Sequence, residues 1–265
     1  MYDRVVVITG ASDGIGRAAA ALFSQNGWTV VNMSRHDSDV PGIINIKTDV
    51  TDEENVKRSF AETGERFGGI NCLVNNAGYG ISGAIEYTEL ADAQRQFDVN
   101  FFGAVRCIKA ALPLLKKRKG RIINISSAAS IFAIPFQSFY SASKSSVDVL
   151  TKALANEIKN TGVTVCALQL GDTKTSFTGS RNKSLAGDEE YGGMISRSVA
   201  KMESDEKNGM SPETVAKAIY GAATAKNQKL ISAVGLMYKS FAVLNRIIPT
   251  DVVNKLIALL YLPEK

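Results

Sequence analysis

The sequence predicts an α/β fold with a single doubly wound domain, in which helices cover both faces of a seven-stranded parallel sheet. Short apolar runs rich in β-branched residues alternate with helix-length segments along most of the chain. The runs VVVIT, INCLVN and RIINIS are apolar almost throughout, as expected of strands covered on both faces. No repeat or linker interrupts the 265 residues. We therefore expect one domain over residues 1–265.

The expected elements follow one another in a regular order. Strands are predicted at residues 4–9, 29–33, 43–46, 70–75, 121–126, 163–168 and 229–232. Helical patterns occupy residues 14–26, 52–67, 89–117, 138–160 and 212–226. Most consecutive strands are thus joined by a helix-length crossover, which parallel strands require.

Two regions break this alternation. Residues 171–210 are polar, rich in Gly, Ser and Lys, and without strong periodicity. A loop of such length in a compact fold usually has a function, so we expect a substrate lid there. Residues 236–262 form an apolar extension divided by Pro249, which predicts two short helices, each too short to cross a bilayer.

Composition argues against several other functions. The net charge is +5, but the basic residues are dispersed, and the one dense run, 116–119, ends a helical pattern where cations complement the helix dipole. We therefore expect no nucleic-acid partner. His36 is the only histidine, which argues against a Ser-His-Asp hydrolase and a His-rich zinc site, and no metal is expected.

The cysteines and the N-terminus predict a cytoplasmic protein. Cys72, Cys107 and Cys166 are odd in number, far apart and embedded in apolar stretches, which fits reduced core thiols. The opening MYDRVVVITG runs directly into a strand, without the long apolar region of a secretion signal.

A glycine-rich turn directly follows the first expected strand. Residues 9–16 read TGASDGIG and precede a helix. Glycines at this spacing allow a tight turn and let the backbone approach a pyrophosphate at the positive helix N-terminus. In a strand–turn–helix context the motif predicts a Rossmann-like dinucleotide site.

Tyr140 and Lys144 are spaced so that they share one face of a helix. A free phenol has a pKa near 10, and a neighbouring cation stabilises the phenolate and lowers that pKa. The pair would then suit acid/base chemistry at neutral pH. Alone the spacing is common and is typical of a solvated helix face, so its meaning depends on the other motifs.

Together these motifs resemble the short-chain dehydrogenase/reductase family, in particular its compact subclass. The resemblance covers about residues 4–232. Besides TGASDGIG, residues 75–78 match the NNAG motif, and Asp49 lies where the family contacts adenine. Ser127 precedes Tyr140 by the family's usual thirteen residues, which selects it over Ser126.

The resemblance implies a catalytic set of Asn100, Ser127, Tyr140 and Lys144. Tyr140 would exchange a proton with the substrate oxygen while hydride passes to or from nicotinamide C4. Lys144 would lower the pKa of Tyr140 and bind the nicotinamide ribose. Ser127 would hold the substrate oxygen, and Asn100 would support a water chain to Lys144.

The resemblance also implies a cofactor-binding set. It consists of Gly10, Ser12, Asp13, Gly14, Ile15, Gly16, Ser34, Arg35, Asp49, Val50, Asn76, Ala77, Gly78, Tyr140, Lys144, Gly171, Thr173 and Thr175.

The end of the second strand predicts the cofactor type. NAD-preferring relatives carry an acid there for the ribose 2′-OH, whereas this chain has Ser34 followed by Arg35. A hydroxyl and a guanidinium suit a 2′-phosphate, and Arg17 could assist them. Asp13 favours the opposite reading, because NADP-preferring relatives often have a basic residue at that position. We expect NADP(H), with NAD(H) as the alternative.

One departure from the family pattern follows the sixth strand. Relatives usually have Pro-Gly there, with a Thr four residues past the Gly. This chain keeps Gly171 and Thr175 but has Leu170 in place of the proline. The exchange changes the expected loop geometry, because proline stiffens a turn, but leaves the chemistry intact.

The substrate is expected to be lipophilic. The apolar extension resembles that of relatives acting on steroids, retinoids or other lipids, whereas 3-ketoacyl-thioester reductases generally end soon after the last strand. Phe132, Ile134, Phe136 and Phe139 add apolar surface before Tyr140, although ordinary core packing explains them equally well. The extension could cover the pocket, pack against a second subunit or rest on a membrane surface.

Other readings remain open at this stage. They are a 3-ketoacyl-thioester reductase, a catalytically silent nucleotide-binding regulatory protein, and an epimerase- or dehydratase-like relative acting on sugar nucleotides. The leading expectation is an NADP(H)-dependent oxidoreductase that interconverts a secondary alcohol and a ketone. The family resemblance implies a homodimer or homotetramer.

Overall fold

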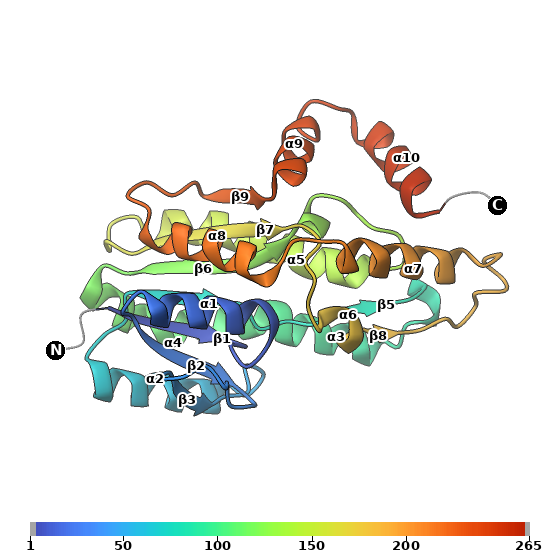
Figure 1. Ribbon diagram of the computed structural model, residues 1–265. Helices are drawn as coiled ribbons and strands as arrows, with labels where there is room; N and C mark the ends of the chain where they lie inside the picture. The colour runs from blue at the N-terminus through green and yellow to red at the C-terminus, as the bar shows by residue number, and fades with distance from the viewer. Residues whose placement is uncertain (1–3, 263–265) are drawn as a thin grey trace.

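The computed structural model describes residues 4–262 and contains a parallel seven-stranded sheet with strand order β3-β2-β1-β4-β6-β7-β9 (Figure 1). Its strands are β1 Val5–Thr9, β2 Thr29–Ser34, β3 Ile44–Lys47, β4 Cys72–Asn75, β6 Arg121–Ser127, β7 Thr164–Leu170 and β9 Ile231–Val234. All neighbouring strands pair in parallel, which confirms the predicted sheet.

Helices cover both faces of this sheet, as predicted. One face packs against α1 Gly14–Gln25 and α8 Pro212–Thr224, and the other packs against α2 Glu53–Phe67, α4 Gly103–Arg118 and α5 Ser138–Glu157. β1 shows why its sequence is continuously apolar. Val5 and Val7 enter the core on one side, and Val6 and Ile8 enter the core on the other. Successive side chains of a strand point to opposite faces, so both faces must be apolar.

The single helix expected at residues 89–117 is divided. α3 Leu90–Phe97 leads into a π-helical turn, η2 Asp98–Phe102, before α4 begins. π-helical turns are rare in proteins overall, and many of those that occur lie at functional sites. At its end, Gly103 lies against Val50, where a Cβ atom would come within 2.8 Å of the valine side chain. The helical period alone does not reveal such a turn.

The long loop expected at residues 171–210 contains regular structure. It includes the short helix α6 Phe177–Ser180, the strand β8 Asn182–Lys183 and the helix α7 Met194–Lys207. β8 pairs in parallel with β5 Ile81–Ser82, outside the main sheet. The short 3-10 turns η1 Ile85–Tyr87 and η3 Ala128–Ser130 complete the elements of the described chain.

The apolar extension forms two short helices, α9 Leu236–Leu244 and α10 Thr250–Tyr261, as expected. Both stand away from the sheet as an arch, with α10 near α7 (Figure 1). Neither has a fully buried side chain, and Leu236 is 83% exposed. Within residues 4–262, every helix is too short or too polar to cross a membrane.

Candidate active site

The glycine-rich turn joins the carboxyl end of β1 to α1. Gly10 and Gly14 have positive φ angles of 69° and 53°, which glycine adopts without strain. Asp13 caps α1, with its carboxylate accepting the Gly14 N–H at 2.6 Å. Gly16 approaches the preceding turn so closely that a Cβ atom would lie 2.1 Å from the Gly10 carbonyl oxygen. Such a turn fits the pyrophosphate of a dinucleotide at the N-terminus of α1.

The segment after β4 is fastened to this turn by hydrogen bonds. The Thr9 hydroxyl accepts the N–H groups of Asn76 and Ala77, both at 3.0 Å. The Asn76 amide donates to the carbonyl oxygens of Thr9 at 2.9 Å and Gly10 at 3.1 Å. Two motifs that are far apart in sequence therefore form one rigid wall at the carboxyl edge of the sheet.

Asn100 is buried in the π-helical turn and holds the backbone after the NNAG motif. Its Oδ1 accepts the Tyr79 N–H at 3.0 Å, and its Nδ2 donates to the Tyr79 carbonyl at 3.0 Å and to Ser143 Oγ at 3.1 Å. A Cβ atom on Gly78 would lie 3.0 Å from Asn100 Oδ1 and 3.5 Å from Lys144 Nζ. Asn100 and Lys144 thus both lie next to Gly78, where a larger residue would contact them.

Tyr140 and Lys144 lie on α5 and face the end of β6. Lys144 is buried, and its Nζ donates to the Ile125 carbonyl at 2.9 Å and lies 5.8 Å from the centre of the Tyr140 ring. Burial lowers the pKa of Lys144 to about 8. The spacing of four residues therefore brings the two side chains together, as predicted.

The ionisation of Tyr140 differs from the simplest expectation. The ring is partly open to a cavity, yet the surrounding protein withholds water and raises the pKa of Tyr140 to about 12. A hydrogen bond from Ser127 acts in the opposite direction but is weaker. The phenol is therefore the resting form at neutral pH, because burial outweighs the groups that lower this pKa, and the expected net lowering is not found.

Ser127 is held at the end of β6. Its Oγ accepts the Ala129 N–H at 3.1 Å and so caps η3. A hydroxyl oxygen that accepts one hydrogen bond can still donate its proton, so this cap is compatible with holding a substrate oxygen.

A cavity of about 1050 Å³ joins most of the predicted site. Its walls include Gly10, Asp13, Gly14, Ile15, Asn76, Ala77, Gly78, Ser127, Tyr140, Lys144, Gly171, Thr173 and Thr175. The other predicted residues lie outside its walls: Ser12, Gly16, Ser34, Arg35, Asp49, Val50 and Asn100.

The residues predicted to choose the cofactor lie at the ends of β2 and β3. Ser34 is buried, and its hydroxyl donates to Asn32 Oδ1, so it is turned inward. Arg35 is exposed. The carboxylate of Asp49 accepts the N–H of Thr51 at 2.9 Å, and nearby Arg35 helps to lower the pKa of Asp49.

Arg17 forms an ion pair with Asp39. Its Nε lies 2.5 Å from Asp39 Oδ1, and its Nη2 lies 3.0 Å from Asp39 Oδ2. The sequence offered Arg17 and Arg35 as ligands for a 2′-phosphate. Since Arg17 is paired with Asp39, Arg35 is the better placed of the two.

The departure at Leu170 has a structural counterpart. Leu170 ends β7, is buried, and pairs with Val234 of β9. An amide N–H is retained there, so the strand continues to Leu170 before the chain turns at Gly171.

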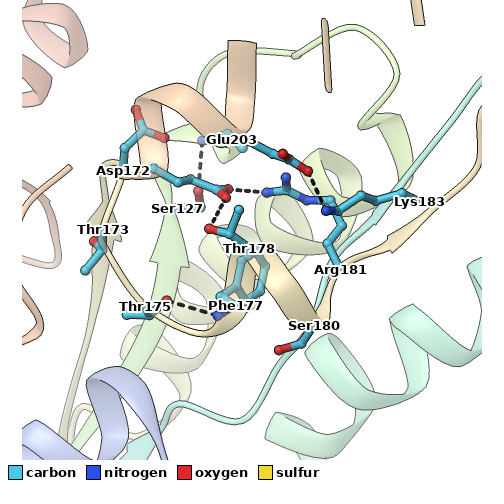
Figure 2. A network of polar contacts seen from close by, with 12 residues as sticks. Ser127, Asp172, Thr173, Thr175, Phe177, Thr178, Ser180, Arg181, Lys183 and Glu203 are labelled. Atoms are coloured by element: carbon cyan, nitrogen blue, oxygen red, sulfur yellow. Dashed lines mark hydrogen bonds and ion pairs between the residues drawn. The ribbon is translucent and has the colours of Figure 1, made fainter. Parts of the chain in front are cut away.

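The structure adds residues that the motifs did not reveal. The Phe177 ring lies 5.8 Å from the Tyr140 ring, and the Arg181 guanidinium lies 5.6 Å from the centre of the Phe177 ring. Arg181 is buried and pairs with Glu206 of α7, while Lys183 pairs with Glu203 (Figure 2). These contacts fix the segment expected to be a lid over the cavity.

A second bridge joins this segment to the glycine-rich turn. The Ser176 hydroxyl donates to the Asp13 carboxylate, and the Phe177 N–H donates to Thr175 Oγ1 at 3.2 Å (Figure 2 shows the latter). Neither contact was predicted from the sequence.

The apolar extension closes the opposite side of the cavity. Tyr238 packs so closely on the chain after β7 that a Cβ atom on Gly171 would lie 1.9 Å from its ring. The Asp172 N–H donates to Tyr238 Oη at 3.1 Å, and the Tyr238 hydroxyl donates to the Asp172 carboxylate. Burial raises the pKa of Asp172. Phe132 and Phe241 also line this side of the cavity, and the centres of their rings are 6.2 Å apart.

Comparison with known proteins identifies the family of this chain. The sequence model of the family described as short chain dehydrogenase matches residues 4–186. The 3-ketodihydrosphingosine reductase of Bacteroides thetaiotaomicron is 38% identical over 239 residues, which cover 89% of each chain. Among solved structures, a short-chain dehydrogenase from Streptomyces avermitilis has a TM-score of 0.83 at 28% identity, covering 97% of this chain and 95% of its own.

A further solved structure is ElxO with NADP bound. It has a TM-score of 0.74 at 29% identity and covers 89% of this chain and 99% of its own. The family match spans more than half of the chain, and the fold agrees with it. The chain therefore belongs to the short chain dehydrogenase family and is an oxidoreductase of that type.

Proposed function

We propose that this protein is an NADP(H)-dependent ketone reductase or alcohol dehydrogenase that acts on a lipophilic substrate. One observation carries the proposal: Tyr140 and the glycine-rich turn line one cavity, and the apolar extension forms its opposite wall. A proton donor beside a dinucleotide turn supports hydride and proton chemistry at a carbon–oxygen bond.

Each residue of the site has a separate role in the reaction. When bound, the nicotinamide supplies or accepts the hydride. Tyr140 donates its phenolic proton to the carbonyl oxygen, and Ser127 donates a hydrogen bond to that same oxygen. Lys144 stabilises the phenolate that remains after the proton transfer, since an ammonium nearby favours the charged form. Asn100 holds the backbone beside Lys144. The raised pKa of Tyr140 keeps the phenol protonated at neutral pH, as a proton donor requires.

We propose that the residues predicted from the sequence bind the cofactor, with those that line the cavity nearest to the reacting groups. Gly10, Gly14 and Gly16 leave the backbone of the turn open to a pyrophosphate. The exposed guanidinium of Arg35 suits a 2′-phosphate, and the turned-in Ser34 leaves Arg35 as the main candidate for that contact. ElxO, whose structure contains NADP, supports NADP(H), and NAD(H) remains the alternative.

The substrate class follows from the extension. Leu244, Ile248, Leu256 and Leu260 of the extension line the cavity. A short polar ketone would leave this wall without contact, whereas an alkyl chain would cover it. The 3-ketodihydrosphingosine reductase supports a keto lipid, because its name describes reduction of a ketone on a lipid. We infer a single domain in which residues 171–210 cover the substrate and residues 236–262 receive its apolar part.

The decisive experiment compares wild type with Tyr140→Phe on ketones of increasing chain length, with NADPH and NADH in parallel. Removing the proton donor should lower kcat by about 10²–10⁴-fold, while NADPH binding measured by fluorescence is retained. Tyr220→Phe, at a tyrosine of α8 that packs against Phe23 and does not line the cavity, is the matched control and should keep full activity. Undiminished turnover by Tyr140→Phe would refute the acid role. Absence of turnover in wild type would favour a silent nucleotide-binding protein.

A further inference from the structure

A buried polar cluster lies behind the catalytic pair and is not used by the mechanism above. Asp148 Oδ2 accepts from Ser130 Oγ at 2.6 Å and from Gln169 Nε2 at 2.7 Å. Ser130 ends η3, which follows Ser127, whereas Asp148 lies on α5 and Gln169 on β7. The cluster therefore joins the elements that carry the catalytic residues.

The carboxylate of Asp148 is only half satisfied by these contacts. Asp148 is 6% exposed, and its Oδ1 is buried without a hydrogen-bond partner in the described structure. A buried carboxylate oxygen without a partner is strongly unfavourable unless a nearby positive charge compensates it. Ser130 and Gln169 are neutral, so they do not supply that charge.

Lys144 supplies the compensating charge. It precedes Asp148 by four residues on α5, and side chains at this spacing are neighbours on one helix face. Its Nζ donates to the neutral Ile125 carbonyl, so the two charges act on each other through space and not through a direct hydrogen bond.

Within residues 4–262, the other groups whose contacts place them near Lys144 are uncharged. They are the amide of Asn100 from η2, the backbone at Gly78 after β4, and the protonated phenol of Tyr140 on α5 itself. Among the described residues, Asp148 is the one whose charge raises the pKa of Lys144, against the lowering caused by burial.

We propose that Asp148 is a positioning residue whose negative charge keeps the buried Lys144 in its ammonium form, so that Lys144 can stabilise the Tyr140 phenolate during turnover. This inference rests on the proposed function for its kinetic consequence only. The electrostatic relationship between Asp148 and Lys144 can be measured in the protein without a reaction.

The kinetic test measures kcat for ketone reduction between pH 6 and pH 10. Asp148→Asn removes the charge but keeps an oxygen that can accept from Ser130 and Gln169. Its alkaline loss of activity should begin about one pH unit lower than in wild type, with little change at pH 6. Ser130→Ala is the matched control, since it removes a hydrogen bond and keeps the charge. Its midpoint should equal that of wild type.

A second readout does not depend on turnover. In protein labelled with ¹³C at the lysine ε-carbons, the Lys144 signal is assigned by its absence in Lys144→Met and titrated by NMR. The midpoint should fall in Asp148→Asn and stay unchanged in Ser130→Ala. An equal midpoint in Asp148→Asn and wild type would overturn the proposal, as would an equal shift in both variants. If wild type has no reductase activity, the proposed function fails, but this titration still decides the role of Asp148.

A stability measurement keeps the proposal testable if Asp148→Asn does not fold. Removing one member of a buried charge pair destabilises a protein strongly, whereas removing both is often neutral. The double variant Lys144→Met/Asp148→Asn should therefore recover soluble, folded protein. Failure of the double variant to recover would show a purely structural role for Asp148 and would contradict charge compensation.

Discussion

The ammonium nitrogen of Lys144 lies 5.8 Å from the centre of the Tyr140 ring and donates to the Ile125 carbonyl at 2.9 Å. Lys144 is 5% exposed, so the catalytic arrangement keeps a cation out of water. Burial lowers the pKa of Lys144 from 10.5 to about 8, which shows that the charged form is disfavoured in the folded protein. The buried ammonium of Lys144 therefore lowers the stability of the folded protein.

In protein that already carries Asp148→Asn, adding Lys144→Met should stabilise the fold while lowering turnover, because no carboxylate then compensates the buried ammonium. The folded pKa of Lys144 is lower than the unfolded value, so the unfolded chain binds more protons between pH 8 and pH 10.5. The destabilisation is fully present below pH 8 and disappears as the pH rises through this window. At pH 7, denaturant unfolding should show a gain of about 1–3 kcal/mol, reduced by the lost hydrogen bond to Ile125.

The control for this measurement is Lys152→Met, at an exposed lysine on the same helix. It should change the free energy of unfolding equally at pH 7 and pH 10. A double variant Lys144→Met/Asp148→Asn that is less stable at pH 7 than Asp148→Asn alone would contradict the burial argument.

Arg35→Ala should change cofactor choice more than overall activity. A guanidinium that binds a 2′-phosphate contributes only with NADPH, so KM for NADPH should rise roughly 10–100-fold and KM for NADH should change little. Arg17→Ala discriminates the alternative, because Arg17 is paired with Asp39 and should have the smaller effect. Equal changes with both cofactors would refute the assignment to Arg35.

The sequence predicted the parts of the site that are continuous along the chain. The glycine-rich turn and the Tyr140–Lys144 pair each lie within one strand–turn–helix or one helix, where spacing determines geometry. The contact of Phe177 with Tyr140 was not predictable, because it depends on how α6 is held by the buried Arg181–Glu206 pair. The π-turn that carries Asn100 also escaped, since its apolar periodicity matches that of an α-helix.

The same distinction applies to the pKa of Tyr140. Spacing placed a cation beside the phenol, but the desolvation that raises its pKa comes from elements that gather only in the folded chain. α9 was predicted as a helix, whereas its packing against Gly171 through Tyr238 could not be read from its composition.

Phe241→Ala should weaken binding of long substrates selectively. Phe241 lines the cavity and packs against Phe132 and Tyr238, with ring centres 6.2 Å and 6.5 Å away. Truncation removes apolar contact worth about 2–3 kcal/mol when fully covered, so KM for long-chain ketones should rise at least about 10-fold. Activity on short ketones should remain, because Tyr140 is untouched.

Val243→Ala is the matched control on α9, since Val243 is 57% exposed and does not line the cavity. It should leave KM unchanged at every chain length in assays of the purified protein. If Phe241→Ala also leaves the chain-length dependence unchanged, the extension does not receive the substrate.

Gly16→Ala tests the close approach in the dinucleotide turn. The added Cβ would lie 2.1 Å from the Gly10 carbonyl oxygen and 2.6 Å from Asn76 Nδ2, so the turn must move away from the NNAG segment. Overpacking of this kind destabilises by about 1–3 kcal/mol, and the displaced turn should bind NADPH at least about 10-fold more weakly. Gly221→Ala, also within a helix but with nothing within 4 Å of its Cβ position, should instead stabilise by about 0.5–1 kcal/mol. Thermal unfolding and NADPH fluorescence titration measure both effects, and unchanged NADPH affinity in Gly16→Ala would show that this turn does not hold the cofactor.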